Sequence, residues 1–319
     1  MGEIRKIATV IGMNSFVEDY LIERLAKENY SIRFAVPQPS KIKRQKIFGK
    51  VGQITPLFLS PSKERTIVRA IEGAELVINL FEANRSDTYN LMHEKNVNFV
   101  KQLAKLCSAS GVRKVFHFSV LGASENSKST YLSSKFEGEQ NVIKEFENAF
   151  ILRPSIIFGP GDSFLNKLCQ IISYLPVVPV YNVNTRLQPV YAGDIADAVC
   201  QLSKKSKLNT QILNLAGSET YTNRELVTLL IHWLHRSNNI SGLTPTFIRL
   251  MSYFLQYMPG KLISPELLNM MEYDSCLDNL KNDLIQLRIV PKSLNLIIPT
   301  YLTCYRPDND LKNMKKLLH

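Results

Sequence analysis

Short apolar runs alternate with amphipathic stretches along roughly the first half of this 319-residue chain. The first run, residues 7–12, ends in Gly12, as a buried strand of a parallel sheet does. Apolar residues then recur at helical spacing, and Asn14 or Ser15 can cap the start of that helix. This order predicts a doubly wound parallel α/β sheet, whose ligand site lies at the carboxyl ends of the strands. Further strands are expected at 31–36, 56–59, 76–80, 115–118 and 149–153, with helices at about 63–71, at 88–109 and from 131.

The length of the chain allows a large core and a second lobe. We expect a Rossmann-like domain over 1–160, to which 185–216 return, and a smaller C-terminal α/β lobe over 161–319. Within that lobe, 243–258 is rich in apolar and aromatic residues but too short to span a bilayer. It is either a core helix or an amphipathic segment that lies on a membrane or a partner.

Other features of the sequence exclude several classes of protein. The five cysteines have no paired spacing, so we expect neither a disulfide framework nor a metal site. The first residues lead directly into the first strand, which leaves no visible targeting peptide. The net charge of +11 favours anionic partners, but no nucleic-acid recognition motif accompanies it, so nucleic acid is not expected.

Tyr131 and Lys135 are the most informative pair of side chains. They stand four residues apart at the start of an expected helix, so they share one face. An ammonium beside a phenol favours the phenolate, which suits proton transfer to or from a carbonyl or hydroxyl. The same pair can hold a ribose without chemistry, and the spacing alone also fits an exposed helix turn. A strand-like run that ends at Ser119 precedes the pair and favours a site, with Ser119 as the third candidate catalytic residue.

The expected phosphate loop after the first strand lacks two of its three glycines. A Gly-x-x-Gly-x-x-Gly arrangement lets the backbone approach a pyrophosphate, whereas this chain has Gly12, Ser15 and Glu18 at the three positions. Ser15 can still donate a hydrogen bond, but Glu18 adds a negative charge near a dianion. We therefore expect weak dinucleotide binding or none, with Gly12, Asn14, Ser15 and Phe16 as the loop residues.

The segment after the second strand carries Lys41, Lys43 and Arg44. In the dinucleotide fold, an acidic residue about 20 positions past the first glycine selects NAD because it binds the ribose hydroxyl. Residues 34–46 contain no acid, so the sequence favours a 2′-phosphate and hence NADPH.

Taken together, these segments resemble the extended and atypical short-chain dehydrogenase/reductase family. The resemblance runs over almost the whole chain, and within the family it is strongest to the nucleotide-binding accessory subunits of respiratory complex I. The segments that carry it are 77–80, 116–119, 131–139, 153–159, 162–166 and 188–194.

The resemblance implies roles for particular residues and partners. Tyr131 and Lys135 would hold the nicotinamide ribose and, in active members, move the proton, with Ser119 near them in a working or vestigial form. The resemblance implies NADPH as cofactor and the other complex I subunits as partners. It also implies a location on the matrix side of the mitochondrial inner membrane or at the cytoplasmic face of a bacterial inner membrane. Glu82 stands where family members often have a small residue, and this departure counts against a working enzyme. The residues that would flank or cover the cofactor are Asn79, Leu80, Phe81, Pro154, Ser155 and Ile156.

Two classes of function therefore compete. The first is a structural nucleotide-binding subunit whose NADPH, if bound, braces the fold without turnover. The second is a free reductase, epimerase or dehydratase that acts through Tyr131. A weaker third is a separate assembly or regulatory protein that senses NADPH.

Overall fold

The computed structural model describes residues 6–13, 15–42, 45–84, 87–205, 211–243, 271–278 and 280–307. The chain divides into two compact units. The first unit comprises Met1–Pro154, Ala192–Leu215 and Leu277–Val290, and the second comprises Ser155–Tyr191, Ala216–Cys276 and Pro291–His319.

The first unit is built on a seven-stranded sheet, and every strand pair in it is parallel. The predicted α/β class, a doubly wound Rossmann-like sheet, is therefore confirmed. Strands β4 and β5 are buried along their whole length, as a central parallel strand covered on both faces must be. In spatial order the strands are β11 (Gln211–Leu215), β6 (Ala149–Pro154), β5 (Lys114–Phe118), β4 (Leu76–Asn79), β1 (Ile7–Ile11), β2 (Ser31–Val36) and β3 (Ile54–Phe58).

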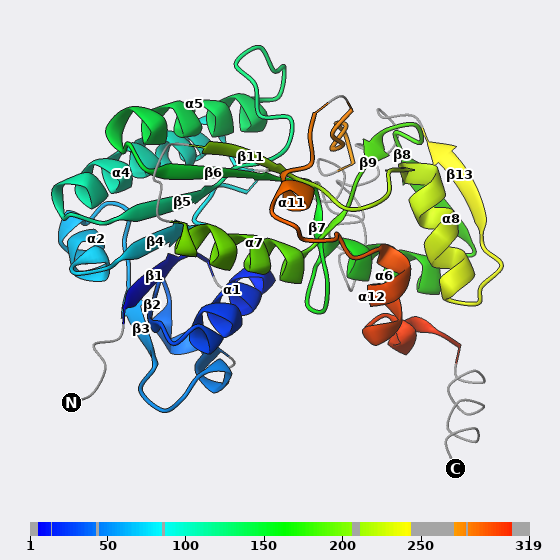
Figure 1. The fold of residues 1–319 in the computed structure, drawn as a ribbon. Helices are drawn as coiled ribbons and strands as arrows, with labels where there is room; N and C mark the ends of the chain where they lie inside the picture. Colours follow the sequence, from blue (N-terminus) through cyan, green and yellow to red (C-terminus); the bar gives the residue numbers. More distant parts are fainter. Residues whose placement is uncertain are drawn as a thin grey trace. The chain divides into compact units, whose positions relative to one another are not determined.

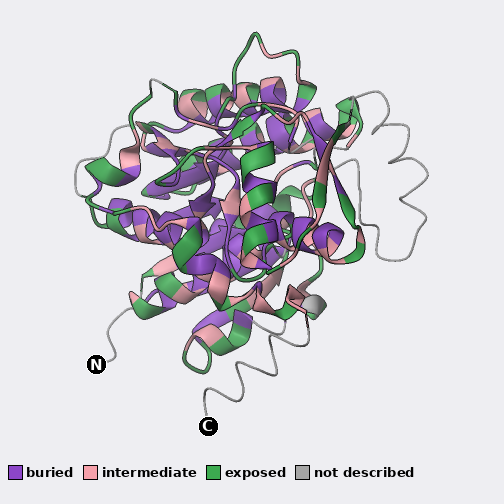
Figure 2. Cartoon of the chain, turned by 90° about the vertical axis from the view of Figure 1, so that its right-hand side faces the viewer, coloured by how far each residue is buried: buried purple, intermediate pink, exposed green. Residues whose placement is uncertain are grey.

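Helices cover both faces of this sheet (Figure 1). One face carries α2 (Glu64–Ile71), α4 (Phe99–Ala109) and α5 (Thr130–Glu145), and the other carries α1 (Phe16–Lys27) and α7 (Ala192–Lys204). The helices have buried and exposed sides, as amphipathic helices that pack on a sheet do (Figure 2). Smaller elements of the unit are the 3₁₀ turns η1 (Pro39–Lys41) and η2 (Gln45–Phe48) and the short helix α11 (Asp283–Gln286).

The helix expected over 88–109 is present without a break over 89–109, but it contains a π-helical turn. The structure has α3 (Tyr89–His93), a π-helical turn η3 (Glu94–Asn98) and then α4. The wider turn accommodates an extra residue and carries Asn96, which is buried. Apolar spacing of 3.6 residues cannot reveal one inserted residue, so the sequence pattern looked continuous.

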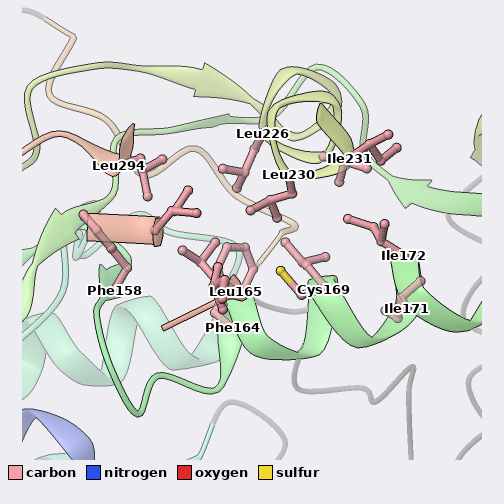
Figure 3. Close-up of a cluster of buried hydrophobic side chains, with 14 of the residues drawn as sticks. Phe158, Phe164, Leu165, Cys169, Ile171, Ile172, Leu226, Leu230, Ile231 and Leu294 are labelled. Carbon is pink, nitrogen blue, oxygen red and sulfur yellow. The ribbon is translucent and has the colours of Figure 1, made fainter. Parts of the chain in front are cut away.

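The described residues of the second unit form three two-stranded sheets and several helices around a core of their own. Figure 3 shows that core, where Leu165 and Cys169 of α6 meet Leu226 and Leu230 of α8. A capping box opens α8, because Thr222 and Glu225 exchange hydrogen bonds of 2.7 and 3.1 Å. The elements are β7 (Ile157–Phe158), α6 (Phe164–Tyr174), β8 (Val177–Tyr181), β9 (Arg186–Leu187), β10 (Val190–Tyr191), β12 (Tyr221–Thr222), α8 (Asn223–Trp233), β13 (Asn239–Leu243), α12 (Leu294–Ile297), η4 (Ile298–Thr300) and η5 (Thr303–Tyr305).

The cysteines, metal sites and membrane-spanning helices are considered next. All five cysteines lie in described ranges and are free thiols. Among the described residues, no cluster of side chains could hold a metal ion, and no helix has the length and apolar character to cross a membrane. Of the apolar segment 243–258, Leu243 is the last residue of a strand, and residues 244–258 lie outside the described residues.

Candidate functional site

The carboxyl ends of the central strands stand in register. Ile11 at the end of β1 pairs with Asn79 of β4, and Asn79 pairs with His117 of β5. This register brings the loops that follow β1, β4 and β5 to one edge of the sheet, which is where ligands bind in doubly wound folds.

Tyr131 and Lys135 lie together at the start of α5, as their spacing predicted. The hydroxyl of Ser129 caps this helix by accepting a hydrogen bond from the backbone of Leu132. The ammonium of Lys135 is only 1% exposed, donates to the carbonyl of Phe118 at 3.0 Å and lies 5.9 Å from the centre of the Tyr131 ring. The structure therefore brings the two residues together beside the end of β5.

The carboxylate of Glu82 binds both of these groups. Its Oε2 accepts the hydroxyl of Tyr131 at 3.1 Å and forms an ion pair with the ammonium of Lys135. The Glu82 side chain is 44% exposed, so its carboxylate reaches these buried partners from the solvent side. Glu82, which the sequence indicated only as a departure from the family pattern, therefore forms a cluster with Tyr131 and Lys135.

Two buried amide side chains hold the backbone on either side of Glu82. Oδ1 of Asn79 accepts from the backbone N–H of Phe81 at 3.2 Å, and Oδ1 of Asn96 accepts from that of Ala83 at 2.8 Å. Asn96 also donates to the hydroxyl of Ser134 on α5 at 2.9 Å. The loop after β4 is therefore fixed to the same helix that carries Tyr131 and Lys135.

Asn96, which the π-helical turn brings to this loop, was not among the residues expected from the sequence. The turn approaches α5 closely at Gly138, where an added β-carbon would lie 2.2 Å from the carbonyl oxygen of Asn96. A buried asparagine within a helix was the available signal, because a polar side chain there needs a partner.

His117 and Ser119, near the carboxyl end of β5, are both buried. Nδ1 of His117 is 3.1 Å from the side-chain nitrogen of Asn79, and burial, with a smaller contribution from the charge of Lys135, lowers the pKa of His117 to about 3. Within the described part of the chain, Nε2 of His117 and the hydroxyl of Ser119 have no hydrogen-bond partner. The structure thus places Ser119 just after β5, with no hydrogen bond between its hydroxyl and Tyr131.

The remaining predicted cofactor residues of the first unit make core or backbone contacts. The ring of Phe81 belongs to the buried core and is tilted by 59° against that of Phe99, with 4.9 Å between the ring centres. The backbone of Leu80 donates to the carbonyl of Ile11 at 2.8 Å. Pro154 ends β6, and its carbonyl accepts from the backbone of Leu121 at 2.9 Å.

Ser155 and Ile156 belong to the second unit. The hydroxyl of Ser155 is bonded to the carbonyl and hydroxyl of Ser275, and Ile156 is part of the core of that unit. Asn14, Lys43 and Arg44, and the side chain of Lys41, lie outside the described residues.

The phosphate-loop residues are arranged around a carboxylate. Ser15 is the N-cap of α1, and Phe16 packs edge-on against Tyr20 of its own helix at 6.3 Å. Glu18 is completely buried and accepts from the backbone N–H groups of Met13 at 2.8 Å and Ser15 at 2.7 Å. The backbone donors of the loop therefore point at a side chain of the protein itself.

A parallel sheet with Tyr131 and Lys135 beside its strand ends defines a dinucleotide fold of the extended short-chain dehydrogenase/reductase type. The chain belongs to the NAD dependent epimerase/dehydratase family, whose model matches residues 8–216. Among solved structures it is similar to DesIV, a dTDP-glucose 4,6-dehydratase from Streptomyces venezuelae with NAD and TYD bound. That match has a TM-score of 0.71 and 14% identity and covers 94% of this chain and 96% of the other.

Two curated relatives point to different roles. The mitochondrial NADH dehydrogenase (ubiquinone) 1 alpha subcomplex subunit 9 of Dictyostelium discoideum is 30% identical over 228 residues, which are 70% of this chain. The chain spans only 63% of that relative's length. A ceramide reductase of Caulobacter vibrioides is 26% identical over 254 residues, which are 78% of this chain and 74% of the relative.

The family name implies a nicotinamide dinucleotide, and the described residues do not fit one in the usual way. Where the pyrophosphate of such a cofactor would approach the backbone, the space above Gly12 is filled by Glu18. Where a ribose would meet Tyr131 and Lys135, both are bound to Glu82.

Proposed function

We propose that the chain is an accessory subunit of respiratory complex I with a structural or assembly role, which binds NADPH weakly or not at all and does not turn it over. Its partners are the other subunits of that complex. Its location is the matrix side of the mitochondrial inner membrane or the cytoplasmic face of a bacterial inner membrane. Contact of 243–258 with the membrane surface is part of the proposal.

The proposed absence of turnover rests on one observation, which is that Glu82 binds both Tyr131 and Lys135. A reductase of this fold needs the Tyr131 hydroxyl to give its proton to a substrate carbonyl. Here that hydroxyl donates to a carboxylate, and the same carboxylate offsets the charge of Lys135. Because Glu82 binds both groups, the pair is suited to hold a loop rather than to move a proton. The Dictyostelium relative, named as a subunit of NADH dehydrogenase, supports the choice of complex.

The alternative is a free NAD(P)-dependent reductase, epimerase or dehydratase that uses Tyr131 and Lys135. The similarity to ceramide reductase favours it, and that match covers a larger share of the relative than the Dictyostelium match does. In this alternative the exposed Glu82 side chain would swing away when substrate and cofactor bind.

Native gel electrophoresis of gently solubilised membranes tests the proposal. We expect the chain to migrate with NADH dehydrogenase activity, and the Tyr131→Phe variant to migrate with it equally, because assembly does not need the hydroxyl. Migration as a free protein, together with steady NADPH oxidation that Tyr131→Phe abolishes, would instead establish the reductase.

We further propose that any dinucleotide bound is NADPH rather than NADH. Residues 34–46 offer basic side chains and no acid for the adenosine ribose. Equal affinities for the two nucleotides in calorimetry would contradict this selectivity.

A further inference from the structure

Glu18 is the third residue of α1, and its carboxylate turns back into the loop that follows β1. Both of its oxygens are used, since Oε1 accepts from the backbone of Met13 and Oε2 from that of Ser15. The residue is 0% exposed, so the carboxylate is enclosed by protein. A fully buried carboxylate is stable only when hydrogen-bond donors surround it, and the loop backbone supplies them.

The position of this carboxylate also accounts for the one glycine that the loop retains. A β-carbon at Gly12 would lie 1.8 Å from Oε1 and 2.4 Å from the carboxyl carbon of Glu18. The φ angle of Gly12 is not in the left-handed region, so backbone strain does not demand a glycine there. The absence of a side chain at Gly12 is required by Glu18 itself.

Backbone N–H groups at the start of a helix form an anion site, because they point outward and the helix dipole favours negative charge. In this chain a carboxylate already holds these donors. A dinucleotide pyrophosphate would need the same donors, and two like charges cannot share them. Binding would have to expel Glu18 from its buried position.

We propose that Glu18 is an internal ligand of the phosphate loop, which occupies the anion position of a dinucleotide pyrophosphate and keeps this dinucleotide fold closed without a nucleotide. Glu82 provides independent support, because a second carboxylate of the chain binds Tyr131 and Lys135, where a ribose would bind. The inference deepens the weak or absent NADPH binding of the proposed function, but it does not depend on membership of complex I.

The test compares the wild-type chain with Glu18→Gly and Glu18→Gln. Glu18→Gly restores the small residue of the usual loop and opens the space above Gly12, whereas Glu18→Gln removes only the charge. Glu23→Gly is the matched control, because Glu23 lies on the same helix, is exposed and pairs only with Lys27 in the described contacts of its side chain. Each protein is titrated with NADPH and with inorganic pyrophosphate, by calorimetry and by the shift in melting temperature.

We expect the wild type to give neither heat nor a melting shift with either probe. Glu18→Gly should melt at a lower temperature without ligand, and it should bind both probes about tenfold or more tightly than the wild type, since two charge-assisted hydrogen bonds become available. Glu18→Gln should bind pyrophosphate more tightly than the wild type. Glu23→Gly should also melt at a lower temperature, because glycine weakens a helix interior, but it should bind the two probes no more tightly than the wild type.

Two results would overturn the inference. One is tight NADPH binding by the wild type, which can be read even if both Glu18 variants fail to fold. The other is a folded Glu18→Gly chain that binds no more tightly than Glu23→Gly. Migration on the native gel is a separate readout. A wild type that runs free while Glu18→Gly gains binding contradicts membership of complex I and leaves the role of Glu18 intact. A wild type that migrates with complex I but binds NADPH tightly contradicts the role of Glu18 and the weak binding, and leaves membership of the complex intact.

Discussion

A β-carbon on Gly12 would overlap Oε1 of Glu18, at a distance of 1.8 Å, so the glycine and the carboxylate require each other. Gly12→Ala should therefore destabilise the chain by about 1–3 kcal/mol, because Glu18 must leave its two backbone donors. In Gly12→Ala/Glu18→Ala the added methyl group meets no carboxylate, and the loss should be smaller than the sum of the single losses by about 0.5 kcal/mol or more. Chemical denaturation of the four proteins measures this coupling.

The control for that cycle replaces Glu18→Ala by Glu23→Ala. Glu23 is exposed on the same helix, so its effect and that of Gly12→Ala should add to within about 0.5 kcal/mol. Coupling of equal size in both cycles would mean that Gly12 responds to α1 as a whole and not to Glu18.

Gly138 should be intolerant of alanine although it lies within a helix. An exposed helical glycine gains about 1 kcal/mol of stability on replacement by alanine. At Gly138 the new methyl group would lie 2.2 Å from the carbonyl of Asn96, so Gly138→Ala should lower the melting temperature. Gln140→Ala on the exposed side of α5 should not. A Gly138→Ala protein as stable as the wild type would show that the π-helical turn can move without cost.

The pair formed by Glu139 and Arg153 should be a strong determinant of stability. The Glu139 carboxylate is fully buried and accepts from Nε of Arg153 at 2.8 Å and from a second guanidinium nitrogen. Arg153→Ala leaves that carboxylate without its cation, which should cost about 3–5 kcal/mol of unfolding free energy. Lys27→Ala breaks the exposed pair with Glu23 and should cost less than about 1 kcal/mol. Similar losses in urea denaturation would contradict the difference in burial.

The sheet could be predicted from the sequence because its strands are short apolar runs between amphipathic stretches, and strand β2 was placed at its observed bounds of 31–36. The meeting of Tyr131 with Lys135 was also accessible, since helix spacing alone determines it. The sequence also placed Glu82 in the loop after the fourth strand. It did not predict that Glu82 binds Tyr131, because the two residues are 49 positions apart. No pattern in one sequence encodes such a pairing.

The phosphate loop illustrates a different limit. The sequence revealed the missing glycines and the charge of Glu18, and both favour weak nucleotide binding. The spacing of Ser15 and Glu18 is that of a capping box, so the bond from the backbone of Ser15 to Glu18 had an available sequence signal. The second bond, from the backbone of Met13, and the complete burial of the carboxylate had no such signal.

Because the imidazole of His117 is buried, the stability of the chain should depend on pH. Burial lowers the pKa of its imidazole to about 3, whereas an unfolded chain has the ordinary value of 6.5. Between these two values the unfolded state binds the extra proton, so stability rises with pH across that window and is complete above it. The slope from this one residue is about 1.4 kcal/mol per pH unit.

Removal of the imidazole should remove that slope. His117→Gln keeps a polar side chain beside Asn79 but cannot take up a proton, so its unfolding free energy should fall less steeply than that of the wild type as the pH is lowered from 6.5 towards 4. His232 on α8 is exposed, and His232→Gln should retain the wild-type slope. Urea denaturation at a series of pH values measures the three slopes. Parallel curves for His117→Gln and the wild type would mean that the buried imidazole is already protonated in the folded protein.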